Sequence, residues 1–290
     1  MAIICKEIDQ VEFRLKADHE FAWLKEYGKV FEVFDQQTSG NICFGITKDN
    51  TRYFLKYAGA STLNFEGDPQ DAIYHLKKSV KVYDDINHPN LIKLIEHGPI
   101  SNGYVVLYQW RDGESLHSHM KYTKEEKYTN PESPNYRFNR LSMDDKLKCL
   151  ETIIELHLEV VKKGYVAVDF YDGSLMYDFS KNDLVICDID MYNKGPFINE
   201  MGRMWGSSRL MAPEEFNKGE LVDEVTNVYL LGAMSFDILG NSRNKVRDEW
   251  QASESLYEVA KKAVQDNRTL RYQSVKEFHI AWNDARKNQK

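Results

Sequence analysis

The stretch Gly206-Ser-Ser-Arg-Leu-Met-Ala-Pro-Glu-Glu215 is the most informative part of this 290-residue chain. It stands shortly before residues 225–239, which are apolar almost throughout. A run of that kind predicts a helix that is buried on every side. The stretch therefore directly precedes the expected central helix of a helical region.

Helical patterns surround that central run. One apolar helix face is formed by residues at helical spacing, and these are Leu147, Leu150, Ile154, Leu158 and Val161. Gly164 follows as a C-terminal stop signal. Ser274 and Glu277 form a capping-box pattern at the start of a last helix. Residues 121–140 are polar, with two prolines, and we expect them to form an exposed insert.

The first half of the chain favours strands. Short aromatic and β-branched runs are separated by polar, glycine-containing segments, as in an antiparallel meander. They cover residues 30–34, 42–46, 53–57, 91–96 and 104–108, with a helix expected at residues 71–85. We therefore predict an α+β protein in which a small sheet-rich lobe precedes a larger helical lobe.

Composition restricts the class of protein. Hydrophobic residues make up 42% and charged residues 29% of the chain, as in an ordinary globular protein. The net charge of -7 disfavours nucleic acid and anionic membranes as partners. We expect no signal peptide, no transmembrane helix and reduced thiols at the four scattered cysteines, which together indicate a cytoplasmic location.

With these elements in place, the chain resembles the protein kinase superfamily, of the Ser/Thr type, from about Gly28 to Trp282. Residues 206–215 resemble the peptide-positioning loop and the Ala-Pro-Glu segment of that family. The resemblance implies a bilobal fold with an N-terminal extension at 1–27, an N-lobe at 28–109 and a C-lobe at 110–290. It also implies that Glu214 pairs with Arg271, which lies in a matching downstream context.

The same resemblance implies which residues bind a nucleotide. Lys56 ends a strand that is similar to the one carrying the kinase lysine, which provides a point charge for phosphates. Gly40 matches the third glycine of a phosphate loop. Residues 106–116 are similar to the interlobe hinge. Besides Lys56 and Gly40, the implied ATP-binding residues are Gln109, Trp110, Glu114 and Ser115.

Residues 163–176 resemble the catalytic loop. Asp169 would orient the proton of the attacking hydroxyl, as the family's carboxylate does. Ser174 replaces the usual asparagine as a weak metal ligand. Asp188 follows the apolar run at 184–187, and a carboxylate after a buried strand suits a hard cation. The implied cofactors are ATP and Mg²⁺, with Mn²⁺ as the alternative ion.

Several supporting residues depart from the family pattern. Ser79 stands where the glutamate of helix C is expected, and Ala167 and Val168 replace the usual His and Arg. Tyr171 stands at a common lysine position. Asn227 replaces an aspartate that usually braces the catalytic loop. These departures put both catalysis and regulation by activation-loop phosphate in doubt.

Three functions remain open on this basis. The first is a kinase acting on a hydroxyl of a protein, which the Ala-Pro-Glu segment favours. The second is a pseudokinase that serves as a binding or scaffolding module, which the missing supporting residues favour. The third is a small-molecule phosphotransferase similar to aminoglycoside kinases. The sequence names neither the substrate nor the oligomeric state.

Overall fold

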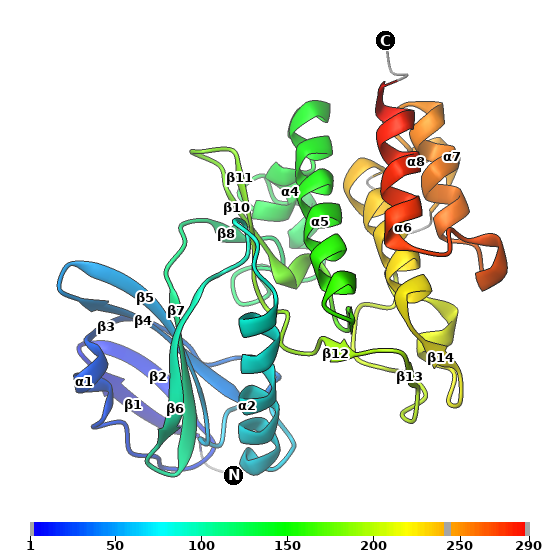
Figure 1. Cartoon of the computed structure of the whole chain (residues 1–290). Coiled ribbons are helices and arrows are strands. Elements are labelled where there is room, and N and C mark those ends of the chain that lie inside the picture. Colours follow the sequence, from blue (N-terminus) through cyan, green and yellow to red (C-terminus); the bar gives the residue numbers. More distant parts are fainter. Residues whose placement is uncertain (1–2, 241–244, 288–290) are drawn as a thin grey trace. The chain divides into compact units, whose positions relative to one another are not determined.

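The computed structural model describes residues 3–240 and 245–287. The chain divides into two compact units. Unit 1 comprises Met1–Asp85 and Ile92–Asp112, and unit 2 comprises Ile86–Leu91 and Gly113–Lys290. The mixed α+β class is confirmed, because unit 1 is built mainly on an antiparallel sheet and unit 2 mainly on helices (Figure 1).

The sheet of unit 1 has five antiparallel strands in the order β3-β4-β5-β7-β6. The expected meander is present as its first three strands. Its strands in chain order are β3 (Lys29–Phe34), β4 (Asn41–Lys48), β5 (Thr51–Ala58), β6 (Leu94–Ile100) and β7 (Gly103–Gln109). Helix α2 (Pro69–Asp85) matches the helix expected at 71–85. The strand expected at 91–96 begins three residues later.

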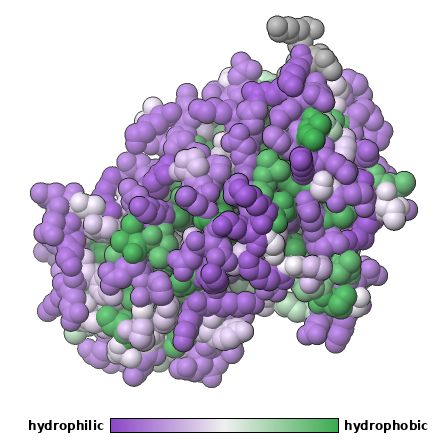
Figure 2. All heavy atoms as spheres, in the orientation of Figure 1, coloured by the Kyte–Doolittle hydropathy of each residue, from purple (hydrophilic) through white to green (hydrophobic). Residues whose placement is uncertain are grey.

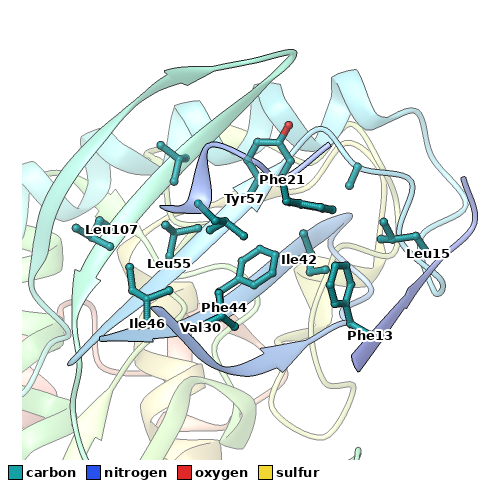
Figure 3. Packing of buried hydrophobic residues seen from close by; sticks show 13 residues of the cluster. Phe13, Leu15, Phe21, Val30, Ile42, Phe44, Ile46, Leu55, Tyr57 and Leu107 are labelled. Atoms are coloured by element: carbon teal, nitrogen blue, oxygen red, sulfur yellow. The ribbon is translucent and has the colours of Figure 1, made fainter. Parts of the chain in front are cut away.

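One face of this sheet is covered by the N-terminal segment. Strands β1 (Ile4–Ile8) and β2 (Val11–Leu15) form a hairpin, and α1 (Leu24–Tyr27) follows it. Phe13, Leu15 and Phe21 lie in one buried cluster with Phe44 and Leu55 of the sheet (Figure 3). Phe13, Leu15 and Phe21 of the expected extension are therefore part of the core of unit 1, because they bury an apolar sheet face that would otherwise be exposed.

Helix α2 packs on the opposite face. Side chains alternate along a strand, so Cys43 and Lys56 point away from the cluster that holds Phe44 and Leu55. Tyr83 of α2 contacts Tyr108 of β7, with 5.1 Å between ring centroids. Lys56 therefore lies on the sheet face that α2 covers.

Unit 2 is organised around α6 (Glu224–Gly240), which is the central helix expected from the sequence. Most of its residues are buried, including the polar residues Thr226, Asn227 and Ser235. It packs against α5 (Met143–Lys162) and α7 (Glu254–Ala263), while α8 (Val275–Lys287) contacts all three (Figure 1). Helix α5 stops as expected, since Gly164 has a φ of 71° and donates its amide to the Val161 carbonyl.

Shorter elements connect these helices. They are β8 (Glu114–Ser115), α3 (Glu126–Thr129), α4 (Pro134–Phe138), β9 (Tyr165–Val166), η1 (Asp172–Ser174), β10 (Leu175–Asp178), β11 (Asp183–Ile186), β12 (Asn193–Lys194), β13 (Phe197–Ile198), η2 (Pro213–Phe216), β14 (Leu221–Val222), η3 (Arg247–Glu249) and η4 (Arg268–Leu270). Ile198 and Leu221 pair across β13 and β14 and are exposed, and Figure 2 shows hydrophobic residues gathered there.

Replacing Phe21 with alanine should destabilise unit 1 by about 3–5 kcal/mol, because the substitution leaves a cavity among Phe13, Phe44 and Tyr57. Urea unfolding, with hydrogen exchange to assign the change to unit 1, measures this effect. Ile3→Ala is the control, since Ile3 is exposed in the same segment. If Phe21→Ala were as stable as Ile3→Ala, the N-terminal segment would not belong to this core.

Candidate functional site

The segment that carries Asp169 is fixed by the central helix of unit 2. Asn227 of α6 is fully buried and forms hydrogen bonds with the backbone just before Asp169. Its Oδ1 accepts a hydrogen bond of 2.8 Å from the Ala167 amide, and its Nδ2 donates one of 3.3 Å to the Tyr165 carbonyl. An amide side chain can do both at once. Asn227 therefore braces this loop despite replacing the expected aspartate.

Asp188 and Ser174 are brought together by the hairpin of β10 and β11. Asp188 follows β11 with a φ of 51°, which turns the chain out of the strand. Ser174 is fully buried, and its hydroxyl donates to the Asp188 carbonyl at 3.3 Å. The Cys187 amide donates to the Ser174 carbonyl at 2.8 Å. The two proposed metal ligands are thus neighbours within unit 2.

The carboxyl groups near this point repel one another. Burial raises the pKa of Asp169 to about 7, and Asp188 and Asp190 add to the shift, whereas Arg203 opposes it. Among the described residues, no three acidic, histidine or cysteine side chains are arranged to hold a metal ion. A hard cation still fits this chemistry, because Mg²⁺ commonly takes one or two carboxylates and completes its shell with water and phosphate.

A second carboxylate of the loop, Asp172, forms ion pairs with neighbouring cations. Burial alone would raise its pKa, but Arg209 and Lys127 hold it below the ordinary value. Arg209 approaches it to 3.0 Å and also binds both oxygens of Asp237 on α6. Lys127 contacts its other oxygen. This ion-pair network ties α3, the loop and α6 together.

Residues 121–140, which we expected to form an exposed insert, are exposed in part and buried in part. Lys127, Ser133, Asn135 and Phe138 are all buried. Ser133 donates to the Lys127 carbonyl at 2.7 Å, so α3 and α4 support the lysine from behind. The polar composition of this segment reflects buried paired groups as well as solvent-exposed residues.

A small pocket lies beside Asp169, within unit 2. Ser207, Glu215 and apolar side chains line it together with Asp169. Gly206 forms part of its wall and has a φ of 135°, and a Cβ added there would meet the Met211 side chain at 3.2 Å. Arg209 donates to the Ser207 hydroxyl at 2.9 Å.

Glu215 is a buried acid without a cationic partner at bonding distance among the described residues. Its exposed fraction is 5%, and Oε2 accepts a hydrogen bond of 2.7 Å from the Ala212 amide. Burial raises the pKa of Glu215 to about 8; Glu214 and Asp169 add to the shift, while the Ala212 hydrogen bond and Arg271 oppose it. The carboxyl therefore keeps its proton at neutral pH.

The expected pair of Glu214 and Arg271 is confirmed. The guanidinium donates to both carboxylate oxygens, at 2.7 and 2.9 Å, and both side chains are almost completely buried. Thr226 of α6 adds a hydrogen bond of 2.9 Å to Glu214. Two segments far apart in sequence are thus locked onto the central helix.

The candidate nucleotide-binding residues of unit 1, Lys56 and Gly40, lie in closely packed surroundings. Lys56 lies in β5 with an exposed fraction of 9%. Ser79, at the position of the expected helix-C glutamate, is buried and donates to the Leu76 carbonyl at 2.8 Å. Gly40 has a φ of 80° and packs so closely on Phe65 and Ala72 that a Cβ would lie 2.7 Å from each. Packing alone therefore requires glycine at this position.

The candidate hinge residues make several hydrogen bonds inside their own units. The Gln109 amide donates to the Lys93 carbonyl at 2.9 Å, and the Trp110 amide donates to the Arg52 carbonyl at 3.4 Å. In unit 2, the Glu114 carboxylate pairs with Arg137 at 2.7 Å. The Ser115 hydroxyl accepts from the His117 amide at 3.3 Å.

Comparison with known proteins adds no family: neither a protein-family model nor a curated protein matches this chain. Within the described part of the chain, every helix is too short or too polar to traverse a lipid bilayer. The four cysteines are all thiols.

Sequence reasoning missed the roles of Lys127, Arg209 and Glu215. The two consecutive glutamates, Glu214 and Glu215, were a signal for Glu215. Only one of the two can bind Arg271 at close range, so the other must have a different environment. Lys127 carries no local signal, because a lysine in a polar segment is usually solvated.

Glu215→Gln should change how stability depends on pH. The folded-state pKa of about 8 exceeds the ordinary 4.5, so the folded chain binds more protons between these values and wild-type stability falls as pH rises from 4.5 to 8. The glutamine variant lacks this fall, which gives it an advantage of a few kcal/mol at pH 9 relative to pH 5. Urea unfolding across this range measures it, and parallel curves for both proteins would contradict it.

Lys127→Met should destabilise unit 2 by roughly 3–5 kcal/mol, since it leaves the buried Asp172 with one cation fewer. Lys124→Met, in the same segment but exposed, should stay within about 0.5 kcal/mol of wild type. Denaturant unfolding of both variants makes the comparison. Equal stabilities would mean that the Lys127 contact contributes nothing.

Proposed function

We propose that this chain is an ATP-dependent phosphotransferase with a bilobal, protein-kinase-like fold, which transfers the γ-phosphate of ATP to a hydroxyl group. The observation that carries the proposal is that Asp169 stands on a loop that is braced from a buried helix and lies near the Asp188 carboxylate. The Ser174 hydroxyl bonds the Asp188 carbonyl. Phosphoryl transfer depends mainly on positioning and electrostatics, and it needs carboxylates held in this way.

Each residue has a proposed role. Asp169 accepts a hydrogen bond from the attacking hydroxyl and takes up its proton, for which a pKa near 7 is well suited. Asp188, with the Ser174 oxygen as a weaker neighbour, would hold Mg²⁺ or Mn²⁺, which neutralises phosphate charge when bound. Lys56 supplies a positive charge for the α and β phosphates.

The ion pair between Glu214 and Arg271 supports the kinase-like fold. Two motifs that resemble kinase segments surround these residues in the sequence, and the structure contains the pair that they imply. A protein acceptor agrees with the segment at 206–215, which packs directly beside Asp169.

A pseudokinase that acts as a binding or scaffolding module is the second candidate. The observation that favours it is Ser79, whose buried hydroxyl is bonded within α2 at the place where an acid would orient Lys56. The close packing at Gly40 agrees with it, since a phosphate loop needs open backbone.

Purified protein incubated with labelled ATP and Mg²⁺ or Mn²⁺ should transfer phosphate to itself or to a hydroxyl acceptor. Asp169→Asn and Asp188→Asn should each lower the rate by at least about 100-fold, because they remove the proton acceptor and the metal ligand. Lys56→Met should weaken ATP binding.

Asp144→Asn is the matched control, since Asp144 is an exposed carboxylate of the first turn of α5. It should leave the rate unchanged. Transfer that survives both Asp169→Asn and Asp188→Asn would disprove these roles. Nucleotide binding without any transfer would favour the pseudokinase.

A further inference from the structure

Exposed large hydrophobic side chains are scattered over the described part of the chain, except that five of them gather within residues 198–221. They form what we call the apolar patch, and their exposed fractions lie between 38% and 55%: Ile198, Met201, Trp205, Phe216 and Leu221. Figure 2 shows hydrophobic residues gathered at the β13 and β14 part of this patch. Single exposed apolar residues are ordinary, whereas a group of this kind marks an interaction surface.

Strands β13 and β14 present apolar side chains on both of their faces. Phe197 and Val222 are paired and pack on a buried cluster of unit 2. Ile198 and Leu221 form the next pair, and because side chains alternate along a strand, they point the other way, into solvent. The solvent face of an antiparallel sheet is normally polar. The outward apolar pair is therefore not explained by the fold of a single chain.

Hydrogen bonds join the other patch residues to the same framework. Asn199 is buried, and its side chain accepts from the Met201 amide at 3.0 Å and donates to the Glu214 carbonyl at 3.1 Å. The residue before Trp205 donates its amide to the carbonyl of the residue before Phe216, at 2.8 Å. The apolar side chains thus stand on an ordered backbone, which lowers the entropy cost of binding a partner.

The area of the patch approaches what a stable interface needs. A large aromatic side chain presents about 150–250 Å², so five large side chains that are 38–55% exposed offer on the order of 500 Å². Polar residues between them enlarge the surface further. A specific interface of standard size takes about 800 Å² from each partner, so this patch with its polar surroundings is large enough for a weak dimer.

The charges around the patch fit a second copy of the same chain. Four exposed charged residues are interspersed with the patch residues in the sequence, and we call them the rim: Glu200, Arg203, Lys218 and Glu220. They carry two charges of each sign, although the whole chain has a net charge of -7. In a two-fold contact, the positive rim residues of one copy can face the negative ones of the other. A rim of one sign would instead suit an acidic or a basic partner.

We propose that the apolar patch is an interface between two copies of this chain, which associate about a two-fold axis so that each patch covers the other. An area at the lower end of the range for specific interfaces corresponds to a reversible dimer with a dissociation constant in the micromolar range. The residues assigned to ATP, metal and the acceptor hydroxyl all lie outside the patch. The dimer is therefore independent of the proposed phosphotransfer.

Sedimentation equilibrium of the full-length protein, at about 1–500 μM, should show an apparent mass that rises from one chain to two with a micromolar midpoint. Trp205→Glu should weaken the association at least about tenfold, because it removes a large aromatic side chain and places a charge in the contact. Ile280→Glu is the matched control, since Ile280 of α8 is 52% exposed and lies outside the patch. It should associate as wild type does.

Lys218→Glu tests the role of the rim, which it leaves with three acids and one base. It should weaken the association more at about 50 mM salt than at about 500 mM, because salt screens exposed charges. Lys124→Glu makes the same change at an exposed lysine outside the patch and should alter the association much less.

A protein that stays a single chain over the whole concentration range overturns the proposal and leaves the patch to a different partner. Association that Trp205→Glu leaves unchanged, or that Ile280→Glu weakens equally, overturns it as well. Circular dichroism confirms that each variant is folded, and Leu221→Glu repeats the test at the other end of the patch. Phosphotransfer can fail while the dimer forms, so the two proposals stand or fall separately.

Discussion

The structure of unit 2 depends on one constraint: a carboxyl group that leaves water must gain a cation or keep its proton. Asp172 and Glu214 satisfy it with cations, through Lys127 and Arg209 in one case and Arg271 in the other. Asp169 and Glu215 have no such partner at bonding distance among the described residues, and their pKa values rise instead. The first two acids hold the framework of unit 2 through ion pairs, whereas burial raises the pKa of the second two.

Helix α6 makes this division possible because its polar residues, two of them buried, bind the surrounding loops. The buried Thr226 binds Glu214, the buried Asn227 binds the backbone before Asp169, and the partly exposed Asp237 binds Arg209. Two of these contacts anchor the segment at 206–215 to the helix, and the third anchors the loop before Asp169 to it. A side chain in a loop can be positioned accurately only when its backbone is supported in this way, so the central helix determines the geometry of the candidate site without contributing a catalytic group.

The sequence predicted the elements whose signals are local. The meander, α2, α5 and α6 follow from periodicity, and the pair of Glu214 and Arg271 followed from two recognisable segments. Lys127 could not be predicted, because its partner Asp172 lies far along the chain and its burial depends on α3 and α4 packing behind it. The role of the N-terminal segment in the core was not predicted for the same physical reason. The apolar residues of 1–27 show no long periodic run, and they become core residues only through contact with the sheet face that they cover.

That covering has a practical consequence for anyone who wishes to shorten the protein. A version starting at residue 28 would keep every candidate site residue, yet it would bare a continuous apolar surface on β4 and β5. Surfaces of that kind drive self-association. Poor solubility of a trimmed protein would then reflect the lost cover, and its inactivity would reveal nothing about catalysis.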